Sequence, residues 1–309
     1  MRPSLEPHDS RAVAAKAFTD KMKDQLMRIA QLATAALVST LLLAVQPGPA
    51  LAETLIKKFG VTDAAATTVV DHSSWSALLE SYVIASDDGI NRVRYADFKR
   101  DGQAALKTYV KTLEAVDVAK LSRPEQIAFW ANLYNAKTID IVLDAYPVKS
   151  IKDISLGGGL LASVTGGPWK AKVLNVSGES LSLDDIEHGI LRPIYKDARV
   201  HYAVNCASIG CPNLMREAFT GAKLDTQLDA GARAYVNTPR GISVAGGAIS
   251  ASSIYKWFVA DFGGNDAGVL AHVRKYADPA LKQKLAPITA ISGYDYNWSL
   301  NDATGAKAR

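Results

Sequence analysis

Residues 122–147 read SRPEQIAFWANLYNAKTIDIVLDAYP, and this stretch decides the fold. Ser122 is a typical N-cap residue, Pro124 suits the first helical turn, and Glu125 follows the cap three residues later. Pro147 cannot continue a helix, so the pattern predicts one helix up to about residue 145. Its apolar residues cover most of the circumference, which is typical of a buried, central helix. They are Ile127, Phe129, Trp130, Leu133, Tyr134, Ile139 and Val142.

Further helices and short strands are predicted around this segment. Apolar residues recur at helical spacing in residues 75–83, 98–118, 224–236, 253–262 and 267–276. Turn residues predict two hairpins, over residues 172–181 and 242–250. Residues 199–206 alternate apolar and polar side chains and are predicted as the best strand. Because hairpins separate strands as often as helices do, we expect an α+β fold, a helix-rich single domain packed on a small antiparallel or mixed sheet.

The N-terminal region has the three parts of a secretory signal. A basic flank precedes an apolar run over residues 29–45, and Ala50-Leu51-Ala52 follows as a cleavage site. Met22 or Met27 as the true start would shorten the unusually long leader. A membrane anchor is the alternative, but a run of about 17 residues is at the short end of what crosses a bilayer. We therefore expect a periplasmic or secreted protein that contacts a membrane only through an uncleaved signal segment.

The predicted organisation places the signal region at residues 1–52, a lead-in without a strong pattern at 53–70, a single domain at 71–301 and a frayed tail at 302–309. Hydrophobic residues make up 48% of the chain and charged residues 21%, as in ordinary globular proteins. The net charge of +4 is mild, and no basic stripe with interleaved aromatic residues occurs. We expect no cofactor and no nucleic-acid partner, and a small molecule or peptide as the ligand.

The densest group of reactive side chains centres on Cys206. It follows the predicted strand and enters a loop, where functional residues tend to lie. A nucleophilic thiol needs a base and a group that orients the base. We expect His188 as the base and Asn135 or Glu187 as the orienting group. Glu187 neighbours His188 in sequence and points about 100° away on a helix, which favours Asn135. His201 is the alternative base, although a regular strand would place it opposite Cys206.

Other interpretations of these residues stay open. Cys206 could be a small buried hydrophobic residue. It could also form a disulfide with Cys211, since exported proteins meet an oxidising compartment, and a labile disulfide of this kind could be redox-active. A metal site from both cysteines with His188 and His201 matches no zinc signature in its spacing. The glycine-rich residues 157–168 form either a mobile cover over a site or a plain surface loop.

Five sequence blocks follow one another in a fixed order and span most of residues 72–301. They are AFWANLYNA at 128–136, LDDIEHGILR at 183–192, HYAVNCASIGCP at 201–212, SIYKWF with DF at 253–262, and YDYNWSLN at 294–301. Together they resemble the signature blocks of a bacterial and plant family, domain of unknown function 547 (DUF547). Ala207-Ser208 departs from it, since members often have glycine and a small residue there. The resemblance implies no activity. It implies that these residues occupy motif positions: Trp130, Asn132, Tyr134, Asn135, Glu187, His188, Arg192, Asn205, Cys206, Cys211 and Pro212.

We therefore expect an exported cysteine-dependent hydrolase or acyl transferase of the papain or transglutaminase type. The Asn205 side chain or nearby loop amides would stabilise an oxyanion. A non-enzymatic binding module with a disulfide-held loop and a thiol–disulfide redox protein are the alternatives. Four aromatic residues are first interpreted as core: Trp130, Tyr134, Trp257 and Trp298. Candidate binding residues are Asn205, Ser208, Trp130, Tyr134, Arg192 and His201.

Overall fold

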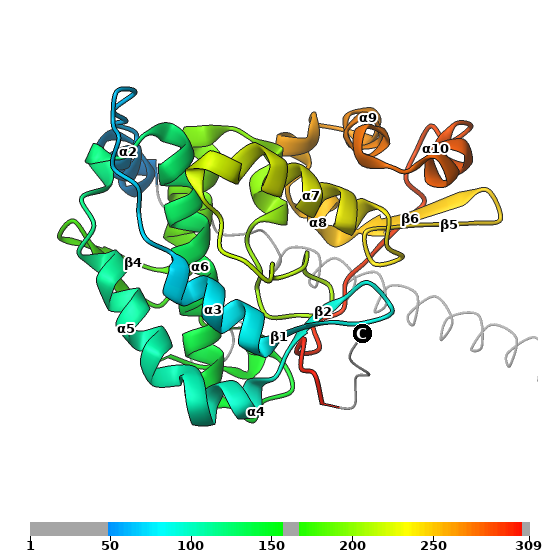
Figure 1. Cartoon of the computed structure of the whole chain (residues 1–309). Coiled ribbons are helices and arrows are strands. Elements are labelled where there is room, and N and C mark those ends of the chain that lie inside the picture. Colours follow the sequence, from blue (N-terminus) through cyan, green and yellow to red (C-terminus); the bar gives the residue numbers. More distant parts are fainter. Residues whose placement is uncertain (1–48, 157–166, 305–309) are drawn as a thin grey trace, which may run out of the picture. The chain divides into compact units, whose positions relative to one another are not determined.

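Helix α6, Arg123–Ala145, runs through the middle of the domain (Figure 1). The structure is a computed structural model that describes residues 49–156 and 167–304. Ser122 has extended backbone before the helix, Pro124 lies in its first turn, and Tyr146 is extended again after it. Buried residues occupy all sides of α6 between Glu125 and Leu143. The predicted central helix is therefore confirmed.

The chain before α6 builds one side of the domain. Helix α5 packs on α6, α3 packs on α5, and α2 packs on the later helix η5. Strands β1 and β2 pair antiparallel, with Val83 opposite Val93. In chain order the elements are α2 (Pro49–Phe59), α3 (Ser73–Tyr82), β1 (Val83–Ala85), β2 (Asn91–Val93), α4 (Tyr95–Asp97), η1 (Phe98–Gly102), α5 (Gln103–Glu114) and η2 (Val118–Lys120).

The chain after α6 supplies the remaining helices and sheets. Helix η5 packs on α6, and α7 contacts both α6 and α9. In chain order these elements are η3 (Ile151–Asp153), β3 (Leu174–Val176), β4 (Glu179–Leu181), η5 (Asp185–Tyr195), η6 (Ala198–Tyr202), η7 (Gly221–Lys223), α7 (Leu224–Val236), β5 (Ile242–Ala245), β6 (Ala248–Ser252), α8 (Ser253–Trp257), η8 (Val259–Phe262), α9 (Asp266–Tyr276), α10 (Pro279–Leu285) and β7 (Gly293–Asp295).

The sheets are small. Strands β3 and β4 form one predicted hairpin, and β5 and β6 form the other. Strand β7 joins β6 in parallel, with Ala251 opposite Tyr294, so the three-stranded sheet is mixed. The predicted class, an α+β fold rich in helices with a small antiparallel or mixed sheet, is confirmed.

Two groups of buried side chains form the core. The larger one surrounds α6 and includes Trp75, Tyr95 and Phe129, each of which is fully buried. The smaller one lies among α7, β5, β6 and α9, around Tyr235 and Tyr255. The described residues nevertheless belong to one compact unit.

The predicted strand at residues 199–206 is wrong. Residues 198–202 form the 3-10 helix η6 instead. The Asp197 side chain accepts a hydrogen bond from the Arg199 amide at 2.9 Å and caps this turn. The alternation misled because both of its sides are buried: Val200, His201 and Tyr202 are each at most 2% exposed. Alternating side chains indicate a strand only where one face meets water.

Residues 53–70 were predicted as a lead-in without a strong pattern. In the structure, residues 53–59 belong to helix α2. Leu55 and Phe59 are buried, and the Phe59 ring meets Trp130 edge-on with centroids 5.0 Å apart. The predicted signal run at residues 29–45 and most of the glycine-rich loop, residues 157–166, lie outside the described residues. Within the described ranges, no helix is long and apolar enough to span a membrane.

Candidate functional site

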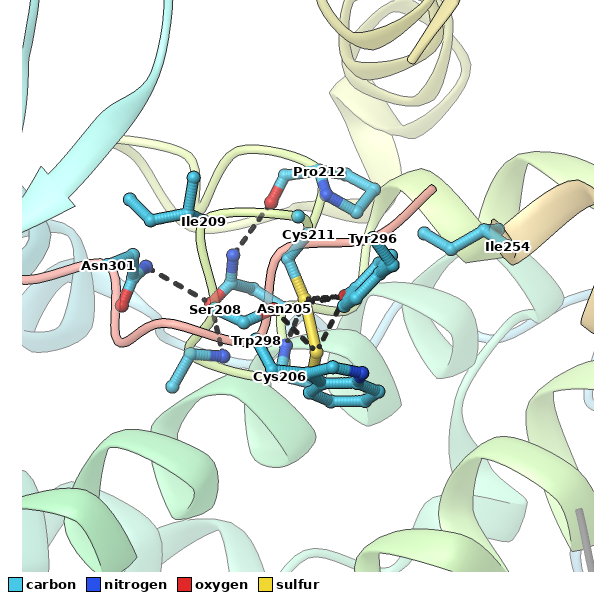
Figure 2. The surroundings of a disulfide bond; sticks show 12 residues. Asn205, Cys206, Ser208, Ile209, Cys211, Pro212, Ile254, Tyr296, Trp298 and Asn301 are labelled. Carbon is cyan, nitrogen blue, oxygen red and sulfur yellow. Dashed lines mark hydrogen bonds between the residues drawn. A yellow bond between two sulfur atoms is a disulfide. The ribbon is translucent and has the colours of Figure 1, made fainter. Parts of the chain in front are cut away.

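Cys206 and Cys211 are joined by a disulfide bond that closes a short loop (Figure 2). Their Cα atoms lie 6.2 Å apart, and five positions separate them in sequence. Cys206 is half-buried, whereas Cys211 is only 2% exposed. Cys206 is therefore the more accessible member of the pair.

Two buried asparagines hold the entry into this loop. The Asn135 amide donates to the Ala203 carbonyl at 2.8 Å and accepts from the Asn205 amide at 2.8 Å. The Asn205 side chain donates to the Pro212 carbonyl at 2.7 Å and accepts from the Ala207 amide at 2.9 Å. Ala207 has a φ of 58°, a left-handed conformation that needs such support. Neither asparagine side chain is therefore available to a bound ligand.

The C-terminal segment frames the other side of the loop. Ile209 donates its amide to the Ser299 carbonyl, and Gly210 donates to the Asn297 carbonyl, both at 2.8 Å. A Cβ atom on Gly210 would lie 2.9 Å from the Asn297 nitrogen, so this approach needs glycine. Tyr235 also donates to the Gly210 carbonyl at 2.7 Å. These bonds shape the loop without using the sulfur atoms.

Tyr296 ties both sulfur atoms to this frame. Its hydroxyl lies 3.1 Å from the sulfur of Cys206 and 3.1 Å from that of Cys211. Ser208 donates to the same hydroxyl at 3.0 Å, which leaves the Tyr296 proton for the sulfur atoms. Burial raises the pKa of Tyr296 well above its ordinary value, so the hydroxyl stays a donor. The Cys206 amide also donates to the Cys211 sulfur, at 2.9 Å.

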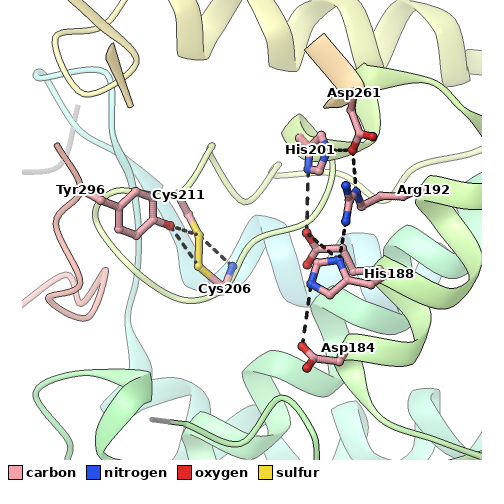
Figure 3. A network of polar contacts seen from close by, with 9 residues as sticks. Asp184, His188, Arg192, His201, Cys206, Cys211, Asp261 and Tyr296 are labelled. Atoms are coloured by element: carbon pink, nitrogen blue, oxygen red, sulfur yellow. Dashed lines mark hydrogen bonds and ion pairs between the residues drawn. A yellow bond between two sulfur atoms is a disulfide. The ribbon is translucent and has the colours of Figure 1, made fainter. Parts of the chain in front are cut away.

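A second polar cluster is built on η5 and appears beside the disulfide loop in Figure 3. Helix η5 is a π-helix, a rare conformation that often occurs at functional sites. His188 Nδ1 lies 3.3 Å from Arg192 Nη1 and accepts its hydrogen bond. Asp184 Oδ1 lies 4.0 Å from His188 Nε2, and Glu187 Oε1 lies 3.9 Å from His188 Nδ1. The imidazole is thus surrounded by charged groups.

His201 and Asp261 complete this cluster from outside η5. His201 Nε2 lies 2.7 Å from Asp261 Oδ2, and Arg192 Nε donates to the same oxygen at 2.5 Å. Glu187 Oε1 lies 3.8 Å from His201 Nδ1, on the other side of the ring. The His201 ring also stacks on Phe258 with centroids 4.3 Å apart. Residues far apart in sequence therefore share one network.

Within the cluster, the pKa values of some groups are raised and those of others are lowered. Burial lowers the pKa of His188 to about 4, so the imidazole is neutral at pH 7. Burial raises the pKa of Asp184 to about 6. Burial would also raise the pKa of Asp261, but hydrogen bonds from His201 and the neighbouring guanidinium outweigh it and hold this pKa well below its usual range. Carboxyl groups whose pKa values are pushed apart are typical of functional sites.

A cavity of about 440 Å³ opens against this cluster. Its size falls within the range of small-molecule sites. Charged and polar side chains line one part, and small apolar side chains line another. The lining residues are His188, Arg192, Pro193, Lys196, Asp197, Ala198, Ala260 and Asp261.

The structure does not pair the predicted nucleophile with a predicted base. Within the described residues, neither His188 nor His201 hydrogen-bonds a sulfur atom, because their ring nitrogens face Arg192 and carboxylates. Among the described residues, the Asn135 side chain bonds only the backbone of Ala203 and Asn205, just before Cys206. It therefore orients the loop rather than an imidazole.

The aromatic residues of the first block lie in the core, as their first interpretation expected. Trp130 is fully buried between Phe59 and Phe129. Tyr134 is buried too. The sequence reasoning overlooked three residues of the site: Asp184, Asp261 and Tyr296. Each lies inside one of the five sequence blocks, which was the signal that could have identified them.

No group of three or more His, Cys, Asp or Glu side chains that could hold a metal ion occurs within residues 49–156 and 167–304. The considered set of His188, His201 and the two cysteines does not converge on a common point. The histidines face carboxylates, whereas the sulfur atoms bond each other and face Tyr296.

Acid is expected to destabilise the protein through His72, which lies away from the site. Its Nδ1 lies 2.6 Å from the Tyr109 hydroxyl, and its buried Nε2 has no hydrogen-bond partner among the described residues. Burial lowers the pKa of His72 from 6.5 to about 4. Between these values the unfolded chain binds a proton that the folded chain does not, so stability falls as the pH drops. The expected loss is at most about 3 kcal/mol, measured by urea unfolding between pH 8 and pH 4.

His72→Asn keeps a polar group near Tyr109 and removes this titration, so it should make the pH dependence less steep. His272 keeps its own share, because burial lowers its pKa to about 4 as well. Asp184 and His188 largely offset each other in the same range, because protonation of Asp184 favours the folded state while protonation of His188 opposes it. An unchanged pH slope in the variant would refute the role of His72.

No curated protein and no solved structure matches the chain. The profile of the family described as "Protein of unknown function, DUF547" matches residues 118–236. This range contains α6, η5, the disulfide loop and α7, whereas the blocks with Asp261 and Tyr296 lie beyond it. The chain therefore carries a DUF547 domain at residues 118–236.

Proposed function

We propose that this protein is an exported thiol–disulfide redox protein whose reactive group is the Cys206–Cys211 pair. One observation carries the proposal: the Tyr296 hydroxyl and the Cys206 amide bond the sulfur atoms on a loop that other bonds already hold. Such donors bind a thiolate more strongly than a neutral disulfide, so they favour the reduced form. The hydrogen bonds that hold the loop also limit how far its backbone moves when the disulfide is reduced.

The proposed step is an exchange with a dithiol of a partner protein or peptide. A substrate thiolate attacks the Cys206 sulfur, the Cys206–Cys211 bond breaks, and its electron pair leaves with Cys211 as thiolate. The second substrate thiol loses its proton and attacks the substrate sulfur of the mixed disulfide, which releases Cys206. The substrate loses two electrons and two protons, and the protein gains them as two thiols. A second partner's disulfide regenerates the bridge by the reverse exchange.

The asymmetry of the pair assigns the roles. Cys206 is half-buried and accessible to attack, whereas the buried Cys211 is the leaving group. The Cys211 sulfur accepts from the Cys206 amide at 2.9 Å and from Tyr296 at 3.1 Å. Stabilisation of the departing thiolate speeds exchange. An oxidising compartment supports the proposal as well, which agrees with the signal predicted at the N-terminus.

The hydrolase expectation has one supporting observation, the perturbed cluster around His188. Its thiol, however, would need an imidazole partner, and among the described residues neither His188 nor His201 hydrogen-bonds a cysteine sulfur. The bonded cysteines and the lack of this contact among the described residues together favour the redox function. A binding module with an inert bridge is the remaining alternative.

Equilibration with glutathione tests the proposal. The bridge is expected to be half reduced at a potential well above about −300 mV, the region below which structural disulfides lie. Cys211→Ser should trap a mixed disulfide of glutathione with Cys206, because the resolving sulfur is missing. Cys206→Ser should trap far less, because Cys211 is buried. Mass spectrometry of the quenched protein measures both.

A bridge that stays oxidised down to about −300 mV would sink the redox proposal and favour the binding module. The reduced protein offers a further discrimination by iodoacetamide labelling. Fast labelling of Cys206 that His188→Ala slows would instead support the hydrolase. Labelling that His188→Ala leaves unchanged agrees with the redox assignment.

A further inference from the structure

The cavity beside η5 has a charge pattern that the redox proposal does not use. Two aspartates line it, and each has an arginine as an ion-pair partner. The Arg199 guanidinium lies 2.7 Å from Asp197 and also pairs with Asp225 and Asp229, which are not part of the cavity lining. The Asp261 carboxylate lies 2.5 Å from Arg192 Nε and 2.7 Å from His201 Nε2. The protein therefore compensates part of the negative charge of each carboxylate.

Two donors on the cavity wall remain. Lys196 is exposed, lines the cavity, and has no ion-pair partner in the part of the chain that the structure describes. Arg192 binds Asp261 through Nε and His188 through Nη1, which leaves Nη2 for a further acceptor. The Arg192 side chain is only 13% exposed and stacks over Phe258, 4.6 Å from the ring centre. Its guanidinium is therefore fixed in place before a ligand arrives.

The backbone places Lys196 at this wall at a conformational cost. Its φ is 52°, and its amide bonds the Arg192 carbonyl at 3.1 Å to end η5. Glycine or asparagine would adopt this left-handed conformation more readily than lysine. A strained non-glycine residue that lines a cavity points to a functional use of its side chain.

We propose that this cavity binds a small organic monocarboxylate, whose carboxylate accepts hydrogen bonds from Lys196 and Arg192. Lys196 lacks an ion-pair partner among the described residues, so its single positive charge matches one negative charge, whereas a doubly charged phosphate would keep one charge without a partner. Pro193, Ala198 and Ala260 give the rest of the lining a small apolar surface for a short aliphatic stem. The ligand class is therefore a short-chain carboxylate, and the site is independent of the disulfide chemistry.

Butyrate is a suitable probe, with butyramide as its uncharged isostere. Calorimetric titration of the full-length protein should show saturable binding of butyrate and none of butyramide. Lys196→Gln is expected to weaken butyrate binding about tenfold, the effect of losing one charge-assisted hydrogen bond. The variant should leave the glutathione equilibrium of the disulfide unchanged, which also shows that it is folded.

Lys284→Gln is the matched control, because Lys284 is an exposed lysine on α10 and outside the cavity lining. It removes the same charge and should bind butyrate like the parent protein. Absent butyrate binding, equal binding of butyramide, or equal losses in both lysine variants would overturn the proposal. Displacement of butyrate by an equal concentration of inorganic phosphate would overturn the assignment to monocarboxylates.

Discussion

Asn135→Ala is expected to lower the free energy of unfolding by about 3–5 kcal/mol, as measured by urea denaturation of the oxidised protein. The substitution leaves the Ala203 carbonyl and the Asn205 amide without their partner in a buried place. Each unsatisfied buried group costs about 1–3 kcal/mol, and the lost side-chain volume adds a small cavity. The total is a large share of the stability of an ordinary domain.

Asn132→Ala on the same helix is the matched control. The Asn132 amide holds the Phe219 backbone in the same two-sided manner, at 2.8 Å and 3.0 Å, but Phe219 lies outside the loop that the disulfide closes. Both variants should be similarly destabilised, and only Asn135→Ala should shift the glutathione equilibrium of the disulfide. If Asn135→Ala lowers the free energy of unfolding by less than about 1 kcal/mol, the Asn135 hydrogen bonds do not hold the loop.

Tyr296→Phe should move the glutathione equilibrium about tenfold toward the disulfide, which corresponds to about 30 mV for a two-electron couple. The phenol donates to whichever sulfur becomes a thiolate, and a hydrogen bond to a charged acceptor is worth about 1.5–3 kcal/mol. The ring itself is kept, so its packing between Trp257 and Trp298, at centroid distances of 4.9 Å and 4.6 Å, survives. Reduction by glutathione should also become slower.

Tyr294→Phe controls for general effects on the C-terminal segment. The Tyr294 hydroxyl binds Asp266 at 3.2 Å and does not contact sulfur. This variant should keep the equilibrium of the parent protein. A shift of equal size in both tyrosine variants would mean that Tyr296 acts through the fold rather than through its hydroxyl.

The sequence predicted those parts of the fold that depend on local chemistry. Helix α6 followed from its cap, its first-turn proline and Pro147, and the hairpins followed from their turn residues. The strand predicted at residues 199–206 was wrong, because a local alternation of apolar and polar residues does not show whether both sets of side chains are buried. The π-helical form of η5 was not predicted either: Pro193 disfavours regular α-helical bonding but does not show which form replaces it.

The candidate site was predictable in its residue types but not in its pairings. Cys206 and His188 were identified, yet their partners come from elsewhere in the chain. Tyr296 is 90 positions from Cys206, and Asp261 is 60 positions from His201. No periodicity connects residues so far apart in sequence. The carboxylates around the histidines and the contact of the Tyr296 hydroxyl with the sulfur atoms could therefore be found only from the structure.

The last strand also sets an order of assembly. Residues 293–302 bond four distant places, which are β2, the Lys149 carbonyl, the cysteine loop and β6. When both cysteines of a growing chain have left the ribosome, residues 293–302 have not yet been made. These residues supply backbone hydrogen bonds to the cysteine loop. The cysteine loop can therefore take up its final hydrogen bonds only after residues 293–302 have been made and have packed against it.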